Sequence, residues 1–463
     1  MNSKAKYVIA SCLVILMLLS FSQVFLETNN VQAQTFSGDR ASWLGLATNA
    51  WAYFQPGTGV NALTGLHGSG LGWPYFTEWD LGTYIQAIID AKQLGLIQND
   101  GLWGFNYRIE LILNFLKTRQ LTSNGLPYLT YDSGTGQPYE DTATFHVDEG
   151  KLYMALYDLE VFRPDLTADV ALIINRNNNT ALLPDPVSLS GSTDFYNYYV
   201  STAFKDLGFS GYADVPSLIL NTIVSQPNVT TYGVELPSAH ICCEPLLLAF
   251  FEINPQDSRY TWLLSQVNLA QEARYEAIRH YTAFSEGNTG LGNPSYVYEF
   301  VIDMNGSAWV VAPRITPIAY LKVAVGFDAI FDTTYTQNMV DYILGSLPTS
   351  NVGFQEGVAE DGRVVGNVID RTNGLVLAAA LYAISNMPAS TPSPTLVSPN
   401  SSANTVNSSP SVSSHFSWLN TPTLIVIAVV ITILFVILPL TFLLKRNHFN
   451  SRKKIRTLRL RRV

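Results

Sequence analysis

Apolar residues recur at helical spacing throughout the middle of this chain. The pattern predicts twelve helices, with boundaries near 40–55, 78–95, 104–121, 148–163, 166–177, 192–207, 213–226, 243–253, 257–279, 317–331, 335–347 and 371–386. Every second helix is apolar or rich in small residues on all sides, as in 246–251 and 375–382, whereas neighbours such as 258–279 carry a charged face. Helices that are apolar on all sides are buried, and amphipathic helices pack outside them. The alternation predicts an all-α (α/α)6 toroid.

The connections between these helices are unequal in length. Each predicted inner helix reaches the next outer one through a short link, whereas the return links are long, at 56–77, 122–147, 178–191, 227–242, 280–316 and 348–370. The inner helices of a toroid run parallel, so the long loops gather at their N-terminal ends. One loop contains a predicted β-hairpin at 296–311, in which Asn305-Gly306 is a type I′ turn signal. We expect binding sites on this face.

Two apolar runs lie outside the helical region. The first, 7–25, follows a short basic segment and leads to Val31-Gln32-Ala33, which predicts a signal peptide at 1–33. An uncleaved anchor is the alternative, because a run of about 19 apolar residues can cross a bilayer. The second run contains no charge between 423 and 444 and predicts a transmembrane helix at 421–444.

The segments around the second run define the remaining organisation. The basic segment 445–463 predicts a cytoplasmic tail by the positive-inside rule, with the rest of the chain outside. Residues 387–420 lack Asp, Glu, Lys and Arg and are rich in Ser, Thr, Pro and Asn, which predicts an extended stalk. Residues 34–386 then form one folded toroid domain, placed outside the cell membrane.

The net charge of −9 is unevenly distributed along the chain. Eleven of the 27 Lys and Arg lie at the two ends, so the part between the apolar runs has 16 bases against 35 acids and a charge of −19. Phosphate binding needs clustered positive charge, which disfavours nucleic acids and other polyanions as partners.

The cysteines and the glycosylation sequons give little information about the fold. Cys242 and Cys243 are the cysteines left after the signal peptide, and adjacent cysteines do not form an ordinary loop-closing disulfide. Five Asn-X-Ser/Thr sequons suit an exported surface and are candidate glycosylation sites: Asn178, Asn228, Asn305, Asn400 and Asn407.

Carboxylates mark the predicted starts of the inner helices. Five of the six starts have an acid within a turn, at Glu78/Asp80, Asp148/Glu149, Asp194, Glu244 and Asp370, whereas the sixth begins at Thr316-Pro317. Helix capping explains any one of them. Capping explains five together less well, because aromatic residues share this face: Trp73, Tyr75, Phe76, Trp79, Tyr128, Tyr131, Tyr139, Phe145 and Trp309.

Rings beside acids are typical of a sugar-binding surface, although packing alone explains each ring singly. The candidate substrate-binding residues are Trp79, Tyr75, Tyr128, Glu149 and Trp309. Hydrolysis of a glycosidic bond needs two carboxyl groups, one protonated and one ionised.

Glu244 is the preferred acid, because Cys242, Cys243 and the apolar residues after it could desolvate its carboxyl and raise its pKa. Asp80 or Asp148 would be the base or nucleophile, and Glu286 and Glu356 are second choices.

Other chemistries lack their sequence signals. His67, His146, His240 and His280 show no zinc-ligand spacing, so no metal site is predicted. The chain also lacks a Walker loop, a dinucleotide fingerprint and a G-x-S-x-G elbow, so no cofactor is predicted.

Several segments together resemble the domain-of-unknown-function family 3131. They are TEWDLGTYIQAIIDAKQLGLI (77–97), GLPYLTYDSGTG (125–136), VDEGKLYMALYDLE (147–160), CEPLLLAFFE (243–252), AQEARYEAIRHYTAFSE (270–286), PSYVYEFVIDMNGSAW (294–309), GFQEGVAEDGR (353–363) and RTNGLVLAAALY (371–382). The resemblance covers nearly all of 40–386. It implies an (α/α)6 toroid similar to endo-β-1,2-glucanases and to the glycoamylase-like group.

The resemblance also implies family-like polar residues at Asp80, Asp148, Glu244, Glu286, Glu356 and Asn373. The chain departs from the family pattern at Cys243, where relatives often have Thr, and at Ala378, where they often have Glu.

The sequence therefore predicts a membrane-anchored, extracytoplasmic protein that acts on a neutral or weakly charged glycan. A glycoside hydrolase or transglycosidase with paired carboxylates is the first hypothesis. A non-catalytic glycan-binding or cell-surface interaction module is the alternative, and a structural envelope protein is the third. The residues leave open whether the carboxylates cut a glycan or only cap helices.

Overall fold

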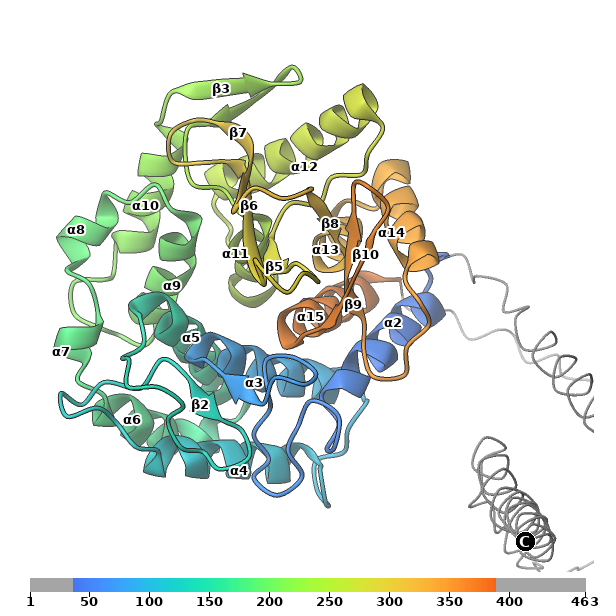
Figure 1. Ribbon diagram of the computed structural model, residues 1–463. Coiled ribbons are helices and arrows are strands. Elements are labelled where there is room, and N and C mark those ends of the chain that lie inside the picture. The colour runs from blue at the N-terminus through green and yellow to red at the C-terminus, as the bar shows by residue number, and fades with distance from the viewer. Residues whose placement is uncertain (1–35, 389–463) are drawn as a thin grey trace, which may run out of the picture. The chain divides into compact units, whose positions relative to one another are not determined.

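The computed structural model of the chain describes residues 36–388. Within them, an inner ring is formed by α3 (Glu78–Gln93), α5 (His146–Phe162), α9 (Phe195–Asp206), α11 (Cys243–Leu248), α13 (Leu321–Phe331) and α15 (Asp370–Asn386). The helix α11 continues into a π-helical turn, η2 (Ala249–Ile253). Each inner helix contacts the next one in the chain, and α15 returns to α3, which closes the ring (Figure 1).

A second set of helices surrounds this ring. It comprises α2 (Arg40–Tyr53), α4 (Phe105–Thr118), α6 (Thr167–Arg176), α10 (Val215–Val224), α12 (Ser258–Ile278) and α14 (Thr334–Ser346), with the short helices η1 (Pro164–Leu166), α7 (Asn179–Leu182) and α8 (Pro186–Ser190) beside them. All twelve predicted helices are therefore present, in the predicted alternation of inner and outer positions. The alternation follows from burial: α13 is buried on all sides from Leu321 to Asp328, whereas α4 buries one face only.

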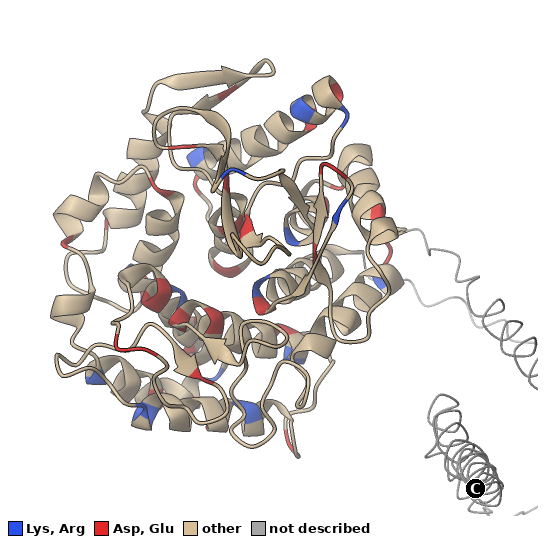
Figure 2. Ribbon diagram, in the orientation of Figure 1, with Lys and Arg blue, Asp and Glu red and all other residues tan. Residues whose placement is uncertain are grey.

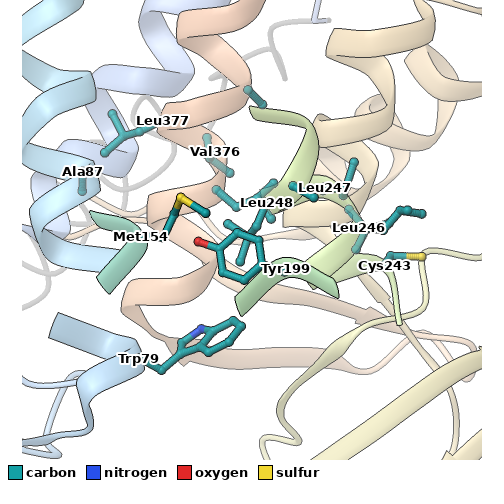
Figure 3. Packing of buried hydrophobic residues seen from close by; sticks show 14 of the residues in the cluster. Trp79, Ala87, Met154, Tyr199, Cys243, Leu246, Leu247, Leu248, Val376 and Leu377 are labelled. Atoms are coloured by element: carbon teal, nitrogen blue, oxygen red, sulfur yellow. The ribbon is translucent and has the colours of Figure 1, made fainter. Parts of the chain in front are cut away.

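Buried apolar side chains pack closely between the inner helices (Figure 3). Trp79, Met154, Tyr199 and Leu248 from four different elements belong to one buried cluster. Glycines let the inner helices approach closely, since a Cβ atom on Gly150 of α5 would stand 2.4 Å from the Cβ of Val200 on α9. This large apolar core supplies the stability, because both cysteines in the described residues are free.

The long loops form four small antiparallel sheets within residues 36–388. The sheets are β1 (Tyr75–Phe76) with β2 (Tyr131–Asp132); β3 (Asn228–Thr231) with β4 (Val234–Pro237); β5 (Glu286–Asn288), β6 (Tyr296–Ile302) and β7 (Ala308–Ala312); and β8 (Ile318–Tyr320), β9 (Gln355–Ala359) and β10 (Val364–Val368). The predicted hairpin is β6 with β7. The other strands were not predicted, so the all-α prediction understated the β-structure.

Two local predictions are wrong. The tenth helix does not begin at residue 317, because Ile318–Tyr320 pairs with β9 as strand β8 and the helix begins at Leu321. Asn305-Gly306 is not a type I′ turn, because within this pair only Gly306 has a positive φ, of 77°. The Asp303 carboxylate instead accepts hydrogen bonds from the backbone N–H groups of Asn305 and Ser307, which organises a longer loop.

Several predictions fall on other parts of the chain. The signal peptide (1–33), nearly all of the stalk (387–420), the transmembrane helix (421–444), the tail (445–463) and the sequons at Asn400 and Asn407 lie outside the described residues. None of the helices between residues 36 and 388 is both long and apolar enough to span a membrane. Asn178, Asn228 and Asn305 are exposed, and their glycosylation stays a prediction.

Candidate active site at the mouth of the helical ring

We call the end of the ring where the inner helices begin the mouth. Figure 2 shows acidic segments in red around the ring centre and an acidic and basic pair at the start of α15. Asp80, Asp148 and Glu244 lie in the first turns of α3, α5 and α11. Glu286 on β5 and Glu356 on β9 come from the loop sheets. The parallel helices and the loops above them therefore place these carboxylates at one end of the ring.

Arg371, at the start of α15, joins most of this cluster. Its Nε lies 3.2 Å from Oδ1 of Asp80, and its Nη1 lies 3.0 Å from Oε1 of Glu286. The same Nη1 donates a hydrogen bond of 2.8 Å to the Tyr296 hydroxyl and lies 4.0 Å from Oε1 of Glu244. The guanidinium also stands over the Trp79 ring, 5.4 Å from its centroid. One side chain thus connects four elements across the ring.

Lys322, in the first turn of α13, is the second cation of the mouth. Its Nζ forms a buried ion pair with the Glu244 carboxylate and donates to the Glu286 carbonyl oxygen at 2.7 Å. Burial lowers the pKa of Lys322, but the negative charges of Glu244, Glu356 and Glu286 outweigh it and the net pKa is raised. Glu244 is buried as the sequence predicted, and Lys322 is its ion-pair partner.

Asp148 differs from the other carboxyls of the mouth. Its side chain is half-buried and forms no hydrogen bond with any residue between 36 and 388. Burial raises its pKa to about 7, with Asp80, Glu286 and Glu78 adding to the increase and Arg371 opposing it. Asp148 is therefore a partly exposed carboxyl that is about half protonated near pH 7.

The two remaining candidate acids are buried. Burial raises the pKa of Glu286, and Arg371 lowers it in part. Burial likewise raises the pKa of Glu356, with Lys322 acting in the opposite direction. The Glu356 carboxyl accepts hydrogen bonds from the Asn288 backbone N–H at 2.8 Å and from the Thr372 hydroxyl, so it ties β9 to β5 and α15.

Exposed aromatic rings border the carboxyls. Tyr75 lies 3.8 Å from Tyr139 and 5.0 Å from Trp73, measured between ring centroids. Trp73 and Tyr139 are 52% and 51% exposed. Tyr298, on β6, is 45% exposed and stands opposite Glu286 in the β5–β6 register. Polar groups and open ring faces therefore occur together at the mouth.

Comparison with known proteins identifies the family of this chain. Residues 45–386 match the family described as protein of unknown function (DUF3131). The chain belongs to the DUF3131 family. No curated protein sequence matches it.

Solved structures similar to this DUF3131 protein include glycan-active enzymes. An endo-β-1,2-glucanase from Chitinophaga pinensis, in complex with sophorotriose and glucose, has a TM-score of 0.52 at 11% identity, over 76% of this chain and 96% of that one. An endo-β-1,2-glucanase from Talaromyces funiculosus with sophorose has a TM-score of 0.54 at 11% identity, over 74% and 84%. A candidate glucoamylase from Bacteroides uniformis has a TM-score of 0.55 at 12% identity, over 76% and 95%. At these identities the likeness shows a shared fold.

Other predicted site residues of this DUF3131 protein have partners away from the carboxyl cluster. Glu149 accepts a hydrogen bond of 2.8 Å from Asn177 and lies 3.7 Å from Arg119, which also pairs with Glu78. The Asn373 side chain bonds to the backbone of Phe354 and Ile369, which fixes the loop before α15.

The predicted aromatic residues divide in the same way. Trp309 donates its indole N–H to the Thr231 hydroxyl at 2.7 Å, toward the β3–β4 hairpin. Tyr128 is buried against Tyr131. Trp79 is buried beneath Arg371, and Tyr75 is the predicted ring that belongs to the exposed group.

Helix capping accounts for part of the acidic pattern. Asp194 caps α9 by accepting a hydrogen bond from the Tyr196 N–H, and it pairs with His240 at 3.2 Å. Asp80 forms a capping box with Thr77 and also binds Arg371, so capping and membership of the cluster coexist there. The departures from the family pattern, Cys243 and Ala378, are both buried.

Sequence reasoning missed Arg371 and Lys322. The signal for Arg371 was available, since it follows Asp370 at the start of an inner helix in a ring whose other starts carry acids. Lys322 is a lone base in the apolar run 321–327, and a lysine buried in such a run needs a carboxylate partner. Among the described residues, no group of three or more His, Cys, Asp and Glu has a geometry that could hold a metal ion.

Proposed function

We propose that the mouth is the active site of a glycoside hydrolase or transglycosidase that acts on a neutral or weakly charged glycan. The observation that carries this proposal is the contrast between Asp148 and its neighbours. Asp148 is partly exposed, forms no ion pair within residues 36–388 and has a pKa raised to about 7, whereas Arg371 pairs with the carboxylates of Asp80 and Glu286. One protonated and one ionised carboxyl are the pair that glycosidic bond cleavage requires.

In this mechanism Asp148 donates its proton to the glycosidic oxygen as the bond from that oxygen to the sugar carbon breaks. Glu286 or Asp80, each paired with Arg371, acts as the second carboxylate, either taking a proton from the attacking water or attacking the sugar carbon itself. A sugar hydroxyl replaces water in transglycosylation. We assign the acid role to Asp148 in place of Glu244, because Lys322 neutralises Glu244 in a buried ion pair.

The neighbouring structures support a glycan as the partner. Two of them are endo-β-1,2-glucanases solved with sophorose or sophorotriose. The strongly acidic composition of the domain favours a neutral or weakly charged glycan over a polyanionic one.

A non-catalytic glycan-binding module is the second candidate function. It is favoured by the ion pairs themselves, because Arg371 and Lys322 hold Asp80, Glu286 and Glu244 in a network that could serve only to shape the mouth. The exposed rings would then supply the binding surface alone.

The purified full chain, incubated with a panel of neutral glucans and cell-surface polysaccharides, should produce new reducing ends. Asp148→Asn should abolish that release, whereas Asp194→Asn, at the start of another inner helix but engaged in capping, should retain it. Binding without any new reducing ends would support the module. Full activity in Asp148→Asn would remove Asp148 from the acid role.

We further propose that residues 421–444 anchor the domain in a membrane, with the toroid outside and residues 445–463 inside. The uncharged run and the basic segment after it support this arrangement. Protease treatment of intact cells should release the toroid domain and leave the basic tail protected. Digestion of the tail together with the domain would contradict the orientation.

A further inference from the structure

The exposed rings Trp73, Tyr139 and Tyr298, with the half-buried rings that contact them, form two separate groups. We call Trp73, Tyr75 and Tyr139 the first ring group; it lies on β1 and the loops beside it, and β1 pairs with β2. The second ring group is Tyr298 with Tyr296, both on β6. Figure 1 shows β2 and β6 on opposite sides of the ring centre.

The three rings of the first ring group contact one another and are held in place by the backbone. Tyr75 packs on Tyr139 at 3.8 Å with 34° between the ring planes, and Trp73 contacts both rings edge-on. The Tyr139 backbone N–H donates to the Thr130 carbonyl at 2.9 Å, which holds its loop against β2. Thr77, two residues after Tyr75, caps the helix that carries Asp80. The first ring group is therefore joined by a short stretch of chain to the start of α3, where Asp80 lies.

The second ring group is attached to the other side of the cluster. Tyr298 pairs with Glu286 across β5 and β6, and directly opposed residues of antiparallel strands point to the same face. Tyr296 accepts a hydrogen bond from Arg371. Burial and the charges of Glu286 and Asp148 raise the pKa of the Tyr298 phenol to about 12, with Arg371 opposing them, so this ring lies within the field of the cluster.

We propose that the mouth binds the interior of a chain-like neutral glycan, with one arm over the first ring group, the other against Tyr298, and the reacting bond between them at Asp148. A site for a chain end needs rings on one side only, because nothing extends beyond the reacting sugar on the other. This inference rests on the proposed function for its glycan partner. It adds that the substrate is a polymer recognised on both sides of the bond.

Binding to glucans of increasing length tests this directly. The full chain carrying Asp148→Asn, which should bind without turnover, is titrated calorimetrically with β-1,2-, β-1,3-, β-1,4- and α-1,4-linked oligosaccharides, from the disaccharide to about the octasaccharide. For the linkage that binds, affinity should rise with length until both ring groups are covered. Added Trp73→Ala or Tyr298→Ala should each weaken binding of the longest chain about tenfold. Trp262→Ala, an exposed ring on the outer helix α12, is the matched control and should change nothing.

Length-independent affinity, or unchanged affinity after Trp73→Ala and Tyr298→Ala, would overturn the inference. Measurements of turnover distinguish failure of this inference from failure of the proposed function. Wild-type cleavage that releases only single sugars from chain ends, and is indifferent to Trp73→Ala, would keep the hydrolase and overturn the inference. Length-dependent binding without any cleavage would keep the inference and overturn the hydrolase. Failure to bind any glycan would contradict both.

Discussion

The ring contains two clusters of charged side chains that differ in access. The mouth cluster consists of Asp80, Glu244, Glu286, Lys322 and Arg371, with Asp148 beside it. The deep cluster consists of Asp90, Lys151, Asp158, Tyr199 and Glu252, further along the inner helices. Lys151 pairs with Glu252 at 2.7 Å, and the Tyr199 hydroxyl donates to the same carboxylate. Both clusters contain carboxyl groups with raised pKa values, and exposed Tyr298 stands opposite Glu286 of the mouth cluster.

The clusters also differ in charge balance. The mouth cluster has two cations, Arg371 and Lys322, for its three paired acids. The deep cluster has one cation, Lys151, for its three acids. Burial and then the charge of Glu252 raise the pKa of Asp90 to about 8, and burial raises the pKa of Asp158. A carboxyl with a raised pKa is therefore insufficient evidence for catalysis, since burial, as the largest cause, raises the pKa of Asp90 and Asp158 away from any candidate substrate.

A small cavity of about 10 Å³ is lined by residues of both clusters, Glu244 and Arg371 from the mouth and Glu252 from the deep cluster. It has room for about one water molecule. This cavity is therefore too small to hold a sugar.

The largest expected effect is on the deep cluster. Lys151→Met should lower the free energy of unfolding by about 3–5 kcal/mol at neutral pH, because it leaves the buried Glu252 without a counter-charge. Urea unfolding measures this. The matched control is Lys205→Met at a side chain that is 46% exposed, where the change should stay below about 0.5 kcal/mol. A loss below about 1 kcal/mol in Lys151→Met would show that the deep ion pair is not needed.

Arg371→Met should lower the free energy of unfolding by less, about 2–3 kcal/mol, because its partners lie closer to solvent. Turnover should fall sharply, and the pKa of Asp148 should rise because Arg371 normally lowers it. The alkaline limb of the pH–rate profile would then move to higher pH, with partial reversal in Arg371→Lys. An unmoved limb would show that Arg371 does not act on Asp148.

Asp90→Asn tests the deep cluster by pH. The folded pKa of Asp90 lies above its usual value of 3.8, so its stabilising contribution is complete at low pH and is lost as the pH rises through about 8. The variant should therefore exceed wild type by about 1–3 kcal/mol in unfolding free energy at pH values above 8, and show little difference near pH 4. If Asp90→Asn is less stable than wild type by the same free energy at both pH values, Asp90 contributes by packing and hydrogen bonding alone.

The smallest effect concerns a cap outside the mouth cluster. Asp194→Ala should cost about 1 kcal/mol of unfolding free energy, the usual value for an N-cap, and leave glycan binding unchanged. Weaker glycan binding in this variant would extend the site to α9.

Much of the fold was predictable from the sequence, because helical apolar periodicity is a local signal. The alternation of all-apolar and one-faced segments was enough to order the twelve helices into a closed ring. The strands were missed because segments such as Ile318–Tyr320 gain their structure from distant partners: Gly357 allows the Ala319 carbonyl to approach so closely that a Cβ there would stand 2.1 Å from its oxygen. No local pattern carries that information.

The sequence predicted which end of the ring carries the carboxyl cluster, but not the contacts that its side chains make. The start of each inner helix identified Asp80, Asp148 and Glu244, because parallel helices bring equivalent positions together. Distances across the ring decide the rest. Only the structure shows that Lys322 pairs with Glu244 and that Asp148 stays partly exposed without an ion-pair partner in the described part of the chain.

The central claim is that Asp148 supplies the proton for glycan cleavage at the mouth. The most direct measurement is the rate of reducing-end release against pH for wild type and Asp148→Asn, with folding of both checked by urea unfolding. We predict that wild-type activity is lost as the pH rises through about 7, the pKa of Asp148, and that Asp148→Asn is folded but inactive at every pH. Wild-type rates in Asp148→Asn, with the same loss near pH 7, would contradict the claim.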